Sequence, residues 1–558
     1  MPGLKNTLAR LTIESLSSDG SGVGRLDGKA VFVPATAPGD DATVKLVKDM
    51  GRYAFGIVEE LHIPGPGHIQ PDCPVYRPCG GCCFRHLDYE TEARAKEGFV
   101  VDAFRRLGGF DALPVLPLLT GPLTDRYRNK VQFPVGYDKD GNVTFGFYAG
   151  RSHRLVPCRD CLLQPKALND IAAAVCAFLQ AHRIPLYNEE THRGLVRHIF
   201  LRQGWHSGQV LLCLVVNGRS LPDSEQFCAE LTAQFPQIKT IVLNVNRQKT
   251  NVITGEECIP LFGAGYIEDT MCGVPVKLGP LSFYQVNTPA AERLYAVARE
   301  FAGLQPTDTL LDLYCGMGTI GLSMADDCGA LVGVEIVPEA VESAKANAAA
   351  MGVQNARFLC ADAGQAAAQL AAEGLSPQVI CLDPPRKGCD AATLDAVLAM
   401  APRRVVMVSC NAATAARDCR YLADRGYRPV KVQPVDLFPR TKHVETVVLL
   451  SHKKPDGHIN VKVEFGEGEG KVPLDNIVKR AEAYKPKERV TYKKIKEYIE
   501  AKYGFKVHTA YIAEVKRSLG LPMYDAPNAV EELKQPRKHP TAEKVEAIKD
   551  ALKYFEVI

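Results

Sequence analysis

No stretch of about 18 apolar residues occurs in the 558-residue chain, so the sequence offers no candidate membrane span. Its first ten residues, MPGLKNTLAR, have no apolar core followed by a small-residue cleavage site, so we expect a cytoplasmic protein. The net charge is only +3, which excludes a histone-like polycation but permits local basic patches for nucleic acid. With 46% hydrophobic and 23% charged residues, the composition is that of an ordinary globular protein with several domains.

Cysteine is missing after Cys419, although the chain contains 18 cysteines, the first of them Cys73. Without a signal peptide we do not expect a disulfide framework. Metal ligands, a nucleophile and buried structural thiols therefore share these residues.

The sequence divides into four regions that differ in composition and hydrophobic pattern, and this predicts a multidomain fold. Residues 1–62 contain short β-branched runs broken by Gly and Asp, with a hairpin turn at Leu26-Asp27-Gly28-Lys29, and predict an OB-like closed β-barrel. Residues 63–285 begin with a Pro- and Gly-rich cysteine loop and continue as a central α+β domain. Residues 286–452 alternate apolar strands with Ala-rich helices, the pattern of a doubly wound, Rossmann-like α/β domain. Residues 453–558 predict a small basic helical extension, either a helix-turn-helix-like module or a helical cap.

A Gly-rich turn in the third region predicts a cofactor pocket. LLDLYCGMGTIGLSMA, residues 310–325, is an apolar strand that runs into this turn and then into a helix. Glu335 ends the next strand, where an acid can bind two ribose hydroxyls. The turn also matches the GxGxxG pattern of dinucleotide sites, but a later Asp-Pro-Pro-Arg sequence favours S-adenosylmethionine. Asp362 follows the third strand and fits either an adenine contact or a helix N-cap.

Three motifs follow the later strands, at the edge where open α/β sheets place their sites. DPPRKG begins with Asp383, which a stiff proline turn follows. VVMVSCN places Cys410 directly after an apolar strand, which suits a nucleophile, although a buried structural cysteine is the more common case. KHVETVVLL places Glu445 at the start of a final strand, where a lone glutamate is usually solvated.

The motifs SFYQVN, DLYCGMGTIGL, GVE, DPPRKG, SCN and HVETV occur in this order and resemble the RNA (uracil-5-)-methyltransferase family over residues 1–452. The first region resembles a TRAM domain, a small barrel attached to RNA-modifying enzymes. The barrel and the cysteine loop together resemble the 23S ribosomal RNA branch of the family. This resemblance implies C5 methylation of uridine in 23S ribosomal RNA, with no DNA or membrane partner. The alternatives are methylation of uracil in the transfer-RNA T-loop and an RNA-binding or assembly protein without catalysis. A radical mechanism would need a CxxxCxxC cluster, which this spacing does not provide.

The resemblance also assigns roles to residues. It implies that Cys410 is the nucleophile that adds to carbon 6 of uracil, and that Glu445 removes the carbon-5 proton after methyl transfer. Six residues match positions that bind S-adenosylmethionine in the family: Gln285, Tyr314, Thr319, Glu335, Asp362 and Asp383. The family often has Phe at the position of Tyr314 and Asn at that of Thr319.

The pattern Cys73-x5-Cys79-x2-Cys82 supplies three thiolates, and either Cys158 or Cys161 can supply a fourth. Four thiolates suit zinc or a [4Fe–4S] cluster. The resemblance implies [4Fe–4S] with Cys161 as the fourth ligand, and Cys83 is a further alternative. Since methyl transfer moves no net electrons, we expect a structural or RNA-platform role for the cluster.

Candidate RNA contacts lie in two regions, and each is equally compatible with a structural role. They are Lys45, Lys48, Arg52 and Tyr53 in the barrel, and RYRNK (126–130) and HRGLVRH (192–198) in the central domain.

Overall fold

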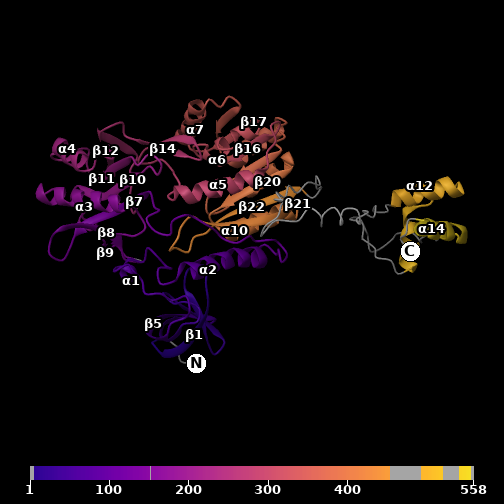
Figure 1. The fold of residues 1–558 in the computed structure, drawn as a ribbon, viewed down its shortest axis with the longest axis horizontal. Coiled ribbons are helices and arrows are strands. Elements are labelled where there is room, and N and C mark those ends of the chain that lie inside the picture. The colour runs from indigo at the N-terminus through magenta and orange to yellow at the C-terminus, as the bar shows by residue number, and fades with distance from the viewer. Residues whose placement is uncertain (1–5, 151, 453–491, 520–539, 555–558) are drawn as a thin grey trace, which may run out of the picture. The chain divides into compact units, whose positions relative to one another are not determined.

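The computed structural model describes residues 6–150, 152–452, 492–519 and 540–554, which belong to two compact units that divide after Asp456 (Figure 1). The first unit contains a closed barrel and two large sheets, and the described part of the second contains three helices. Among the helices of these residues, none has the length and apolar character needed to cross a membrane.

Five strands near the N-terminus close into a barrel in the order β1-β2-β3-β5-β4. Its core is aliphatic and includes the fully buried Val31, Val44 and Leu46. Asp27 and Gly28 both have positive φ, the turn geometry that matches the twist of a two-stranded hairpin. The predicted barrel and its hairpin turn are therefore confirmed. The strands are β1 (Leu8–Leu16), β2 (Gly22–Leu26), β3 (Lys29–Val33), β4 (Asp41–Asp49) and β5 (Tyr53–Ile63).

The chain that follows the barrel packs partly with the last sheet of the first unit. After the short α1 (Tyr76–Cys79), α2 (Tyr89–Asp102) begins where the Asp88 side chain accepts a hydrogen bond from the Thr91 N–H. It ends in a π turn, and β6 (Leu119–Thr120) then pairs with β21 (Tyr427–Asp436). Apolar spacing predicts a helix here, but it does not show which sheet the helix covers.

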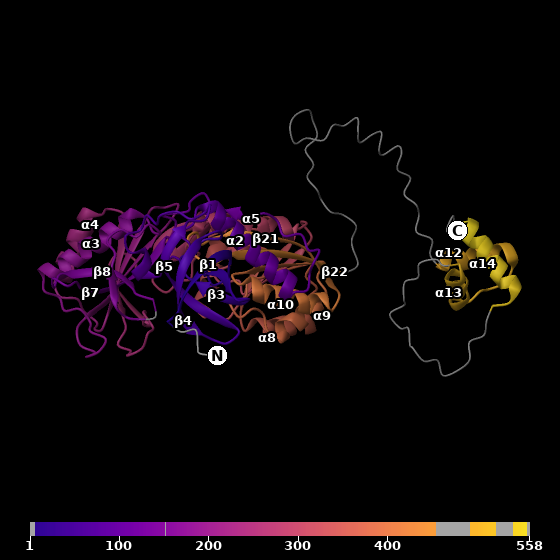
Figure 2. The same cartoon turned by 90° about the horizontal axis from the view of Figure 1, so that it is seen from below.

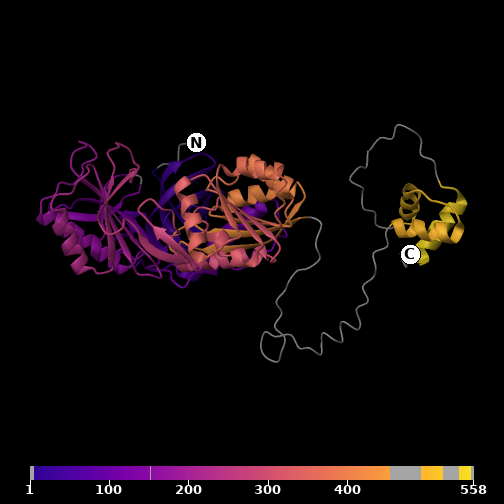
Figure 3. The same cartoon turned by 90° about the horizontal axis from the view of Figure 1, so that it is seen from above.

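The central sheet has the strand order β13-β12-β11-β10-β7-β8-β9. Its α3 and α4 pack on one face around a core that includes Phe133, Leu201 and Leu243. In Figure 3 its strands fan out beside the second sheet. The elements are β7 (Lys130–Tyr137), β8 (Val143–Tyr148), β9 (Leu155–Pro157), α3 (Lys166–Ala181), β10 (Val196–Gln203), β11 (Val210–Val216), α4 (Ser224–Gln234), β12 (Ile238–Val245) and β13 (Glu257–Phe262).

The second sheet has eight strands in the order β18-β17-β16-β19-β20-β22-β21-β6. The strands β18, β17, β16, β19 and β20 run parallel, and β22 is antiparallel to β20. The hairpin β14–β15, α5 and α7 share one core, while α2, α8, α9 and α10 share the other. Figure 2 shows α8, α9 and α10 together on one side of the domain. The predicted doubly wound domain is confirmed. Its elements are β14 (Ile267–Met271), β15 (Val274–Leu278), α5 (Thr288–Ala302), β16 (Thr309–Leu313), α6 (Thr319–Leu322), β17 (Ala330–Glu335), α7 (Pro338–Met351), β18 (Ala356–Cys360), α8 (Ala363–Ala372), β19 (Val379–Leu382), α9 (Ala391–Met400), β20 (Arg404–Ser409), α10 (Ala412–Ala423) and β22 (Glu445–His452).

The described part of the second unit is a helical module with its own apolar core. Its helices are α12 (Tyr492–Tyr503), α13 (Thr509–Ser518) and α14 (Ala542–Tyr554). Ile499, Ile512 and Leu552 are fully buried among them. The rest of the predicted 453–558 extension, residues 453–491, 520–539 and 555–558, lies outside the described residues.

Candidate active site

The Gly-rich turn leaves β16 in a left-handed conformation that opens a space at the sheet edge. Tyr314, Gly316 and Gly318 have φ of 65°, 55° and 80°. A β-carbon placed on Gly316 would meet no atom of the described part of the chain within 4 Å, so the backbone at this point borders open space. The turn is therefore shaped for close approach of a ligand.

Glu335 is oriented by backbone N–H groups at the end of β17. Its Oε2 accepts a hydrogen bond from the Gly316 N–H at 3.0 Å, and Oε1 accepts from the N–H groups of Ile336 and Val337 at 2.8 and 2.9 Å. These bonds tie the carboxylate to the Gly-rich turn. Its position at the end of the second strand suits the predicted contact to ribose hydroxyls.

Asp312 is a buried carboxylate beneath this turn that the sequence interpretation missed. Its Oδ2 accepts a hydrogen bond from the Gly321 N–H at 2.9 Å, while Oδ1 is buried and has no hydrogen-bond partner among the described residues. Burial raises the pKa of Asp312 to about 7. An orphaned carboxylate oxygen beside an open turn fits a cationic ligand such as S-adenosylmethionine. The available signal was a carboxylate that interrupts the apolar run Leu310–Leu313.

A second missed residue, Tyr295 on α5, connects three of the predicted cofactor positions. Its hydroxyl lies 3.5 Å from Thr319 Oγ1 and also interacts with Gln285 and Asp383. Burial raises the pKa of Asp383 to about 7. The structure thus brings Gln285, Thr319 and Asp383 around one buried tyrosine.

The remaining predicted cofactor residues have partners within the protein. The Tyr314 hydroxyl lies 3.2 Å from Thr393 Oγ1. Asp362 caps α8, where its Oδ1 accepts hydrogen bonds from the N–H groups of Gly364 and Gln365. The N-cap alternative for Asp362 is therefore realised, and its contact to a cofactor stays a prediction.

Cys410 and Glu445 meet across two antiparallel strands. Ser409 at the end of β20 pairs with Thr446 on β22, so the next residues on either side of this pair, Cys410 and Glu445, lie opposite each other. Cys410 is half-buried, and Glu445 is only 6% exposed rather than solvated. Burial and the nearby Asp383 raise the pKa of Glu445 to about 8.

The same neighbouring groups shift the pKa of the Cys410 thiol. Burial, then Glu445 and Asp383, raise its pKa, and Arg386 opposes this shift. The Asn411 side chain donates to the Arg386 carbonyl at 3.3 Å, which links the two motifs. A thiol, two carboxyl groups and a guanidinium therefore share one site at the sheet edge.

The cysteine loop lies next to the segment that carries Cys158 and Cys161. Cys161 interacts electrostatically with Cys73, Cys79 and Cys82. By contrast, Cys83 lies against Gly20 and interacts with Lys96 and Glu92 on α2. Within the described residues, no three His, Cys, Asp or Glu side chains are arranged as metal ligands. The donor chemistry fits a thiolate-bound cluster, and the ligand set stays a prediction.

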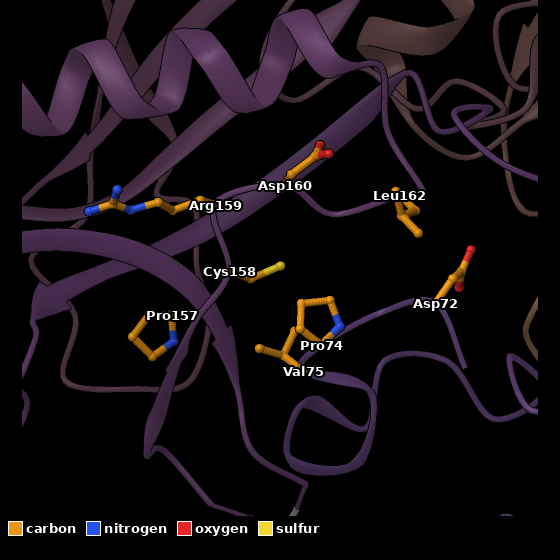
Figure 4. A pocket seen from close by; sticks show the side chains of 8 residues that line it. All are labelled: Asp72, Pro74, Val75, Pro157, Cys158, Arg159, Asp160 and Leu162. Carbon is orange, nitrogen blue, oxygen red and sulfur yellow. The ribbon is translucent and has the colours of Figure 1, made fainter. Parts of the chain in front are cut away.

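Cys158 faces a cavity between the two cysteine-bearing segments. The cavity has a volume of about 370 Å³ and is lined by Asp72, Pro74, Val75, Pro157, Cys158, Arg159, Asp160 and Leu162. Figure 4 shows the Cys158 sulfur directed into it. A hydrogen bond between the thiols of Cys158 and Cys161 lowers the pKa of Cys161 and raises that of Cys158.

Most of the RYRNK segment has structural partners. Arg126 forms a bidentate ion pair with Asp160, and the buried Tyr127 hydroxyl donates to the Pro439 carbonyl at 2.8 Å. The Asn129 side chain donates to the Gln285 carbonyl at 2.8 Å, which fixes the loop that carries Gln285. In HRGLVRH, the buried Arg197 likewise donates to backbone carbonyls of residues 246 and 248. Arg126, Tyr127, Asn129 and Arg197 therefore have the structural role that was the alternative to RNA contact.

The barrel presents an exposed ring beside basic residues. Tyr53 is 38% exposed and contacts Phe32 and Phe55 edge-on, while Lys48 and Arg52 are exposed. An aromatic ring flanked by cations is the kind of surface on which single-stranded bases stack.

This chain is similar in sequence and in fold to known RNA methyltransferases. A family model described as tRNA (Uracil-5-)-methyltransferase matches residues 277–453, and a TRAM domain model matches residues 5–58. An uncharacterized RNA methyltransferase of Oceanobacillus iheyensis is 40% identical over 453 residues, which cover 81% of this chain and 98% of that protein. Another, of Halalkalibacterium halodurans, is 41% identical over 452 residues, which cover 81% of this chain and 98% of that protein. The structure of Pyrococcus abyssi tRNA (uracil-54, C5)-methyltransferase in complex with S-adenosyl-L-homocysteine has a TM-score of 0.63 and 25% identity, covering 79% of this chain and 100% of that one.

The doubly wound sheet, its Gly-rich turn and the acid at the end of β17, taken with the family match and the likeness to a structure that holds S-adenosyl-L-homocysteine, define the class as a methyltransferase. The N-terminal TRAM barrel adds a module found on RNA-modifying enzymes. The chain belongs to the RNA (uracil-5-)-methyltransferase family and is an enzyme that transfers a one-carbon group to RNA.

Proposed function

We propose that the protein methylates carbon 5 of a uridine in 23S ribosomal RNA through a covalent bond between Cys410 and carbon 6 of the uracil. The observation that carries this proposal is the juxtaposition of Cys410 and Glu445 across β20 and β22, with Asp383 interacting with both. A nucleophile beside a base is what addition to carbon 6, followed by proton removal from carbon 5, requires.

The residues divide the reaction between them. Cys410 adds as a thiolate to carbon 6, which makes carbon 5 an enolate carbon able to accept a methyl group. S-adenosylmethionine supplies that methyl group when it is bound. Glu445 then takes the carbon-5 proton, and Cys410 leaves carbon 6. Glu445 takes this proton in its carboxylate form, which is the minor form at neutral pH because its pKa is about 8. That carboxylate is a stronger base than an exposed glutamate, which suits removal of a proton from carbon.

Cofactor binding falls to the residues around the Gly-rich turn. In this proposal Glu335 binds the ribose hydroxyls and Asp362 the adenine, while Gln285, Tyr314, Thr319 and Asp383 line the remainder. The partnerless Oδ1 of Asp312 adds a negative group beneath the turn, where it complements the cationic donor.

We further propose that Cys73, Cys79, Cys82 and Cys161 hold a [4Fe–4S] cluster. The proximity of Cys161 to the three loop thiols supports this ligand set. When bound, such a cluster cross-links the loop to the 158–161 segment through four thiolates. Because methyl transfer moves no net electrons, the reaction needs no electron from the cluster.

Two observations bear on which RNA is the substrate. The TRAM barrel and the cysteine loop occur together here, and their combination resembles the ribosomal-RNA branch of the family. The Pyrococcus abyssi relative is named for uracil 54 of transfer RNA, which makes the transfer-RNA T-loop the second candidate.

Mass-spectrometric mapping of 5-methyluridine separates these candidates. Ribosomal and transfer RNA from cells with and without the gene are digested and compared. Loss of 5-methyluridine from 23S ribosomal RNA is the expected result. Loss confined to transfer RNA would select the second candidate, and no loss from either RNA would contradict the proposed activity.

A further inference from the structure

The segment that leads into Glu445 is held from several directions. Residues 437–444, here called the base loop, connect β21 to β22. The Asn287 side chain donates to the Leu437 carbonyl at 3.0 Å. The Tyr127 hydroxyl donates to the Pro439 carbonyl at 2.8 Å. Each of these contacts comes from a part of the chain far away in sequence, so the base loop is fixed by tertiary contacts.

A buried ionic network holds the beginning of the base loop. Lys96 on α2 donates to Asp436 Oδ1 at 2.9 Å and to the Phe438 carbonyl at 3.0 Å, and it pairs with Glu92 at 2.8 Å. The side chains of Glu92, Lys96 and Asp436 have no exposed surface. Buried ion pairs add little to stability compared with apolar residues of the same size. Their effect here is to define one position for the loop.

Arg440 is the point where the base loop meets the cysteine loop. Its carbonyl accepts hydrogen bonds from the N–H groups of Cys83 and Phe84 at 3.1 and 3.2 Å, and its own N–H donates to Glu92 Oε1 at 2.7 Å. Its φ of 68° is left-handed, which a residue other than glycine keeps only when its surroundings enforce it. Cys83 and Phe84 directly follow Cys82, a predicted cluster ligand.

We infer that Tyr127, Glu92 and the Cys82–Phe84 turn act together as a clamp on the base loop that positions Glu445 to take the carbon-5 proton. This inference rests on the proposed function. The contacts of the clamp end on the base loop, and those named here are made neither to Cys410 nor to a predicted cofactor residue. We therefore expect loss of the clamp to act mainly on the step after methyl transfer. Tyr127, Glu92 and Arg440 are positioning residues, since they act through Glu445.

A pair of buried tyrosines allows a matched test. The hydroxyl of Tyr127 donates to Pro439 in the base loop, and that of Tyr427 donates to Pro402 outside it, both at 2.8 Å. Tyr127→Phe and Tyr427→Phe therefore lose equivalent hydrogen bonds. The variants are assayed with S-adenosylmethionine and total RNA from cells that lack the gene. The readouts are kcat, the KM for S-adenosylmethionine, the melting temperature, and the fraction of enzyme in a methylated covalent RNA complex on a denaturing gel.

We expect Tyr127→Phe to lower kcat about tenfold and to accumulate the covalent complex, with the KM for S-adenosylmethionine within about twofold of the wild type. Tyr427→Phe should lower the melting temperature by about as much as Tyr127→Phe does, but it should leave kcat unchanged. Equal kcat in the two variants, or a lower kcat without the complex, overturns the inference.

Arg440 provides a second, independent comparison. Asparagine tolerates a left-handed backbone, whereas valine does not. Both substitutions lose the contacts of the guanidinium to the Leu87 carbonyl, Glu92 and Asp125, so they differ in the backbone alone. Arg440→Asn should keep more turnover than Arg440→Val, and Arg440→Val should accumulate more of the covalent complex. Equal effects of both substitutions would mean that the backbone of residue 440 positions nothing.

Glu445→Gln separates a failure of the clamp from a failure of the proposed function. If Glu445→Gln accumulates the complex and Tyr127→Phe does not, the clamp alone is wrong. If no variant, including Glu445→Gln, forms a complex that depends on Cys410, the proposed chemistry is wrong and the clamp falls with it.

Discussion

Glu445 binds a proton more tightly in the folded protein than in the unfolded chain, because burial and Asp383 raise its pKa from 4.5 to about 8. Between these two values the folded state holds the extra proton, so stability decreases as the pH rises through this window. We expect Glu445→Gln to reduce the decrease in melting temperature between pH 5 and pH 8. Glu342→Gln, at an exposed position on α7, serves as the control and should keep the wild-type profile. Superimposable profiles for Glu445→Gln and the wild type would contradict burial of an ionisable group here.

The same substitution has a chemical consequence. Glu445→Gln keeps the shape of the side chain but removes the base, so Cys410 can still attack and the methyl group can still be transferred. We expect turnover to fall by about 10²- to 10⁴-fold, and the enzyme to accumulate as a methylated covalent RNA complex on a denaturing gel. Cys410→Ala should abolish both turnover and the complex. Normal turnover of Glu445→Gln would show that another group removes the proton.

Sequence reasoning finds residues that stand in recognisable motifs and misses residues that matter through burial. Asp383 and Cys410 stand in short motifs after apolar strands, Glu445 stands at the start of one, and their roles come from the family resemblance. The surroundings of Glu445 do not, because a glutamate at a strand start is indistinguishable in sequence from a solvated one. Asp312 and Tyr295 were missed because their environment depends on which helix and turn close over them.

At the scale of elements, local pattern predicts strands and helices well and their neighbours less well. The strand, Gly-rich turn and helix predicted over residues 310–325 are present in the structure as β16, the turn at Gly316 and Gly318, and α6. The same patterns do not reveal that α2 and β6 join the second sheet, since this pairing involves residues more than 300 positions apart. The function of RYRNK was equally ambiguous until Tyr127 and Asn129 were seen to hold other loops.

The cysteine segments give a prediction about metal content. Protein purified anaerobically should be brown and contain about four irons per chain. Cys161 interacts with all three loop thiols, whereas Cys158, whose sulfur faces the cavity, interacts with Cys73 and Cys79. Cys161→Ser should therefore lower iron content and melting temperature more than Cys158→Ser. Stoichiometric zinc without visible absorbance would rule out the iron–sulfur cluster. Equal effects of the two substitutions would contradict the assignment of Cys161 as the fourth ligand.

Strands β7 and β10 give a prediction about RNA. Lys130 and Arg202 lie directly opposite each other in these strands, with Arg128 nearby, and burial followed by these arginines lowers the pKa of Lys130 to about 8. Arg202 is buried and donates to the carbonyls of Gly279 and Ser282, so of the two only Lys130, which is partly exposed, can meet an RNA phosphate. Like charges opposite each other are destabilising, and a phosphate bound by Lys130 would offset this repulsion. We expect Lys130→Met to raise the KM for RNA severalfold, to leave the KM for S-adenosylmethionine unchanged, and not to lower the melting temperature. Lys139→Met, in the exposed β7–β8 turn, is the control. An unchanged KM for RNA would show that Lys130 meets no phosphate.

At the scale of the whole molecule, the helical extension is separable from the enzyme that precedes it. Residues 453–558 contain 22 Lys and Arg against 17 Asp and Glu, an excess of positive charge over the rest of the chain. The division after Asp456 and the separate core around Ile499 and Ile512 indicate that a chain ending at residue 456 keeps its fold.

Truncation after residue 456 therefore tests the extension without disturbing the active site. If the extension contacts RNA phosphates, each lost contact reduces the slope of log K against log salt by about 0.7 to 0.9. We expect the truncated chain to bind RNA more weakly at low salt and with a shallower slope, while its kcat at saturating RNA stays unchanged. The measurement is RNA affinity by filter binding at several salt concentrations for both chains. An identical slope would show that the extension does not engage phosphates. Unfolding of the first unit would also weaken RNA binding. A shallower slope therefore counts as loss of phosphate contacts only if the first unit melts at the same temperature in the truncated and the full chain.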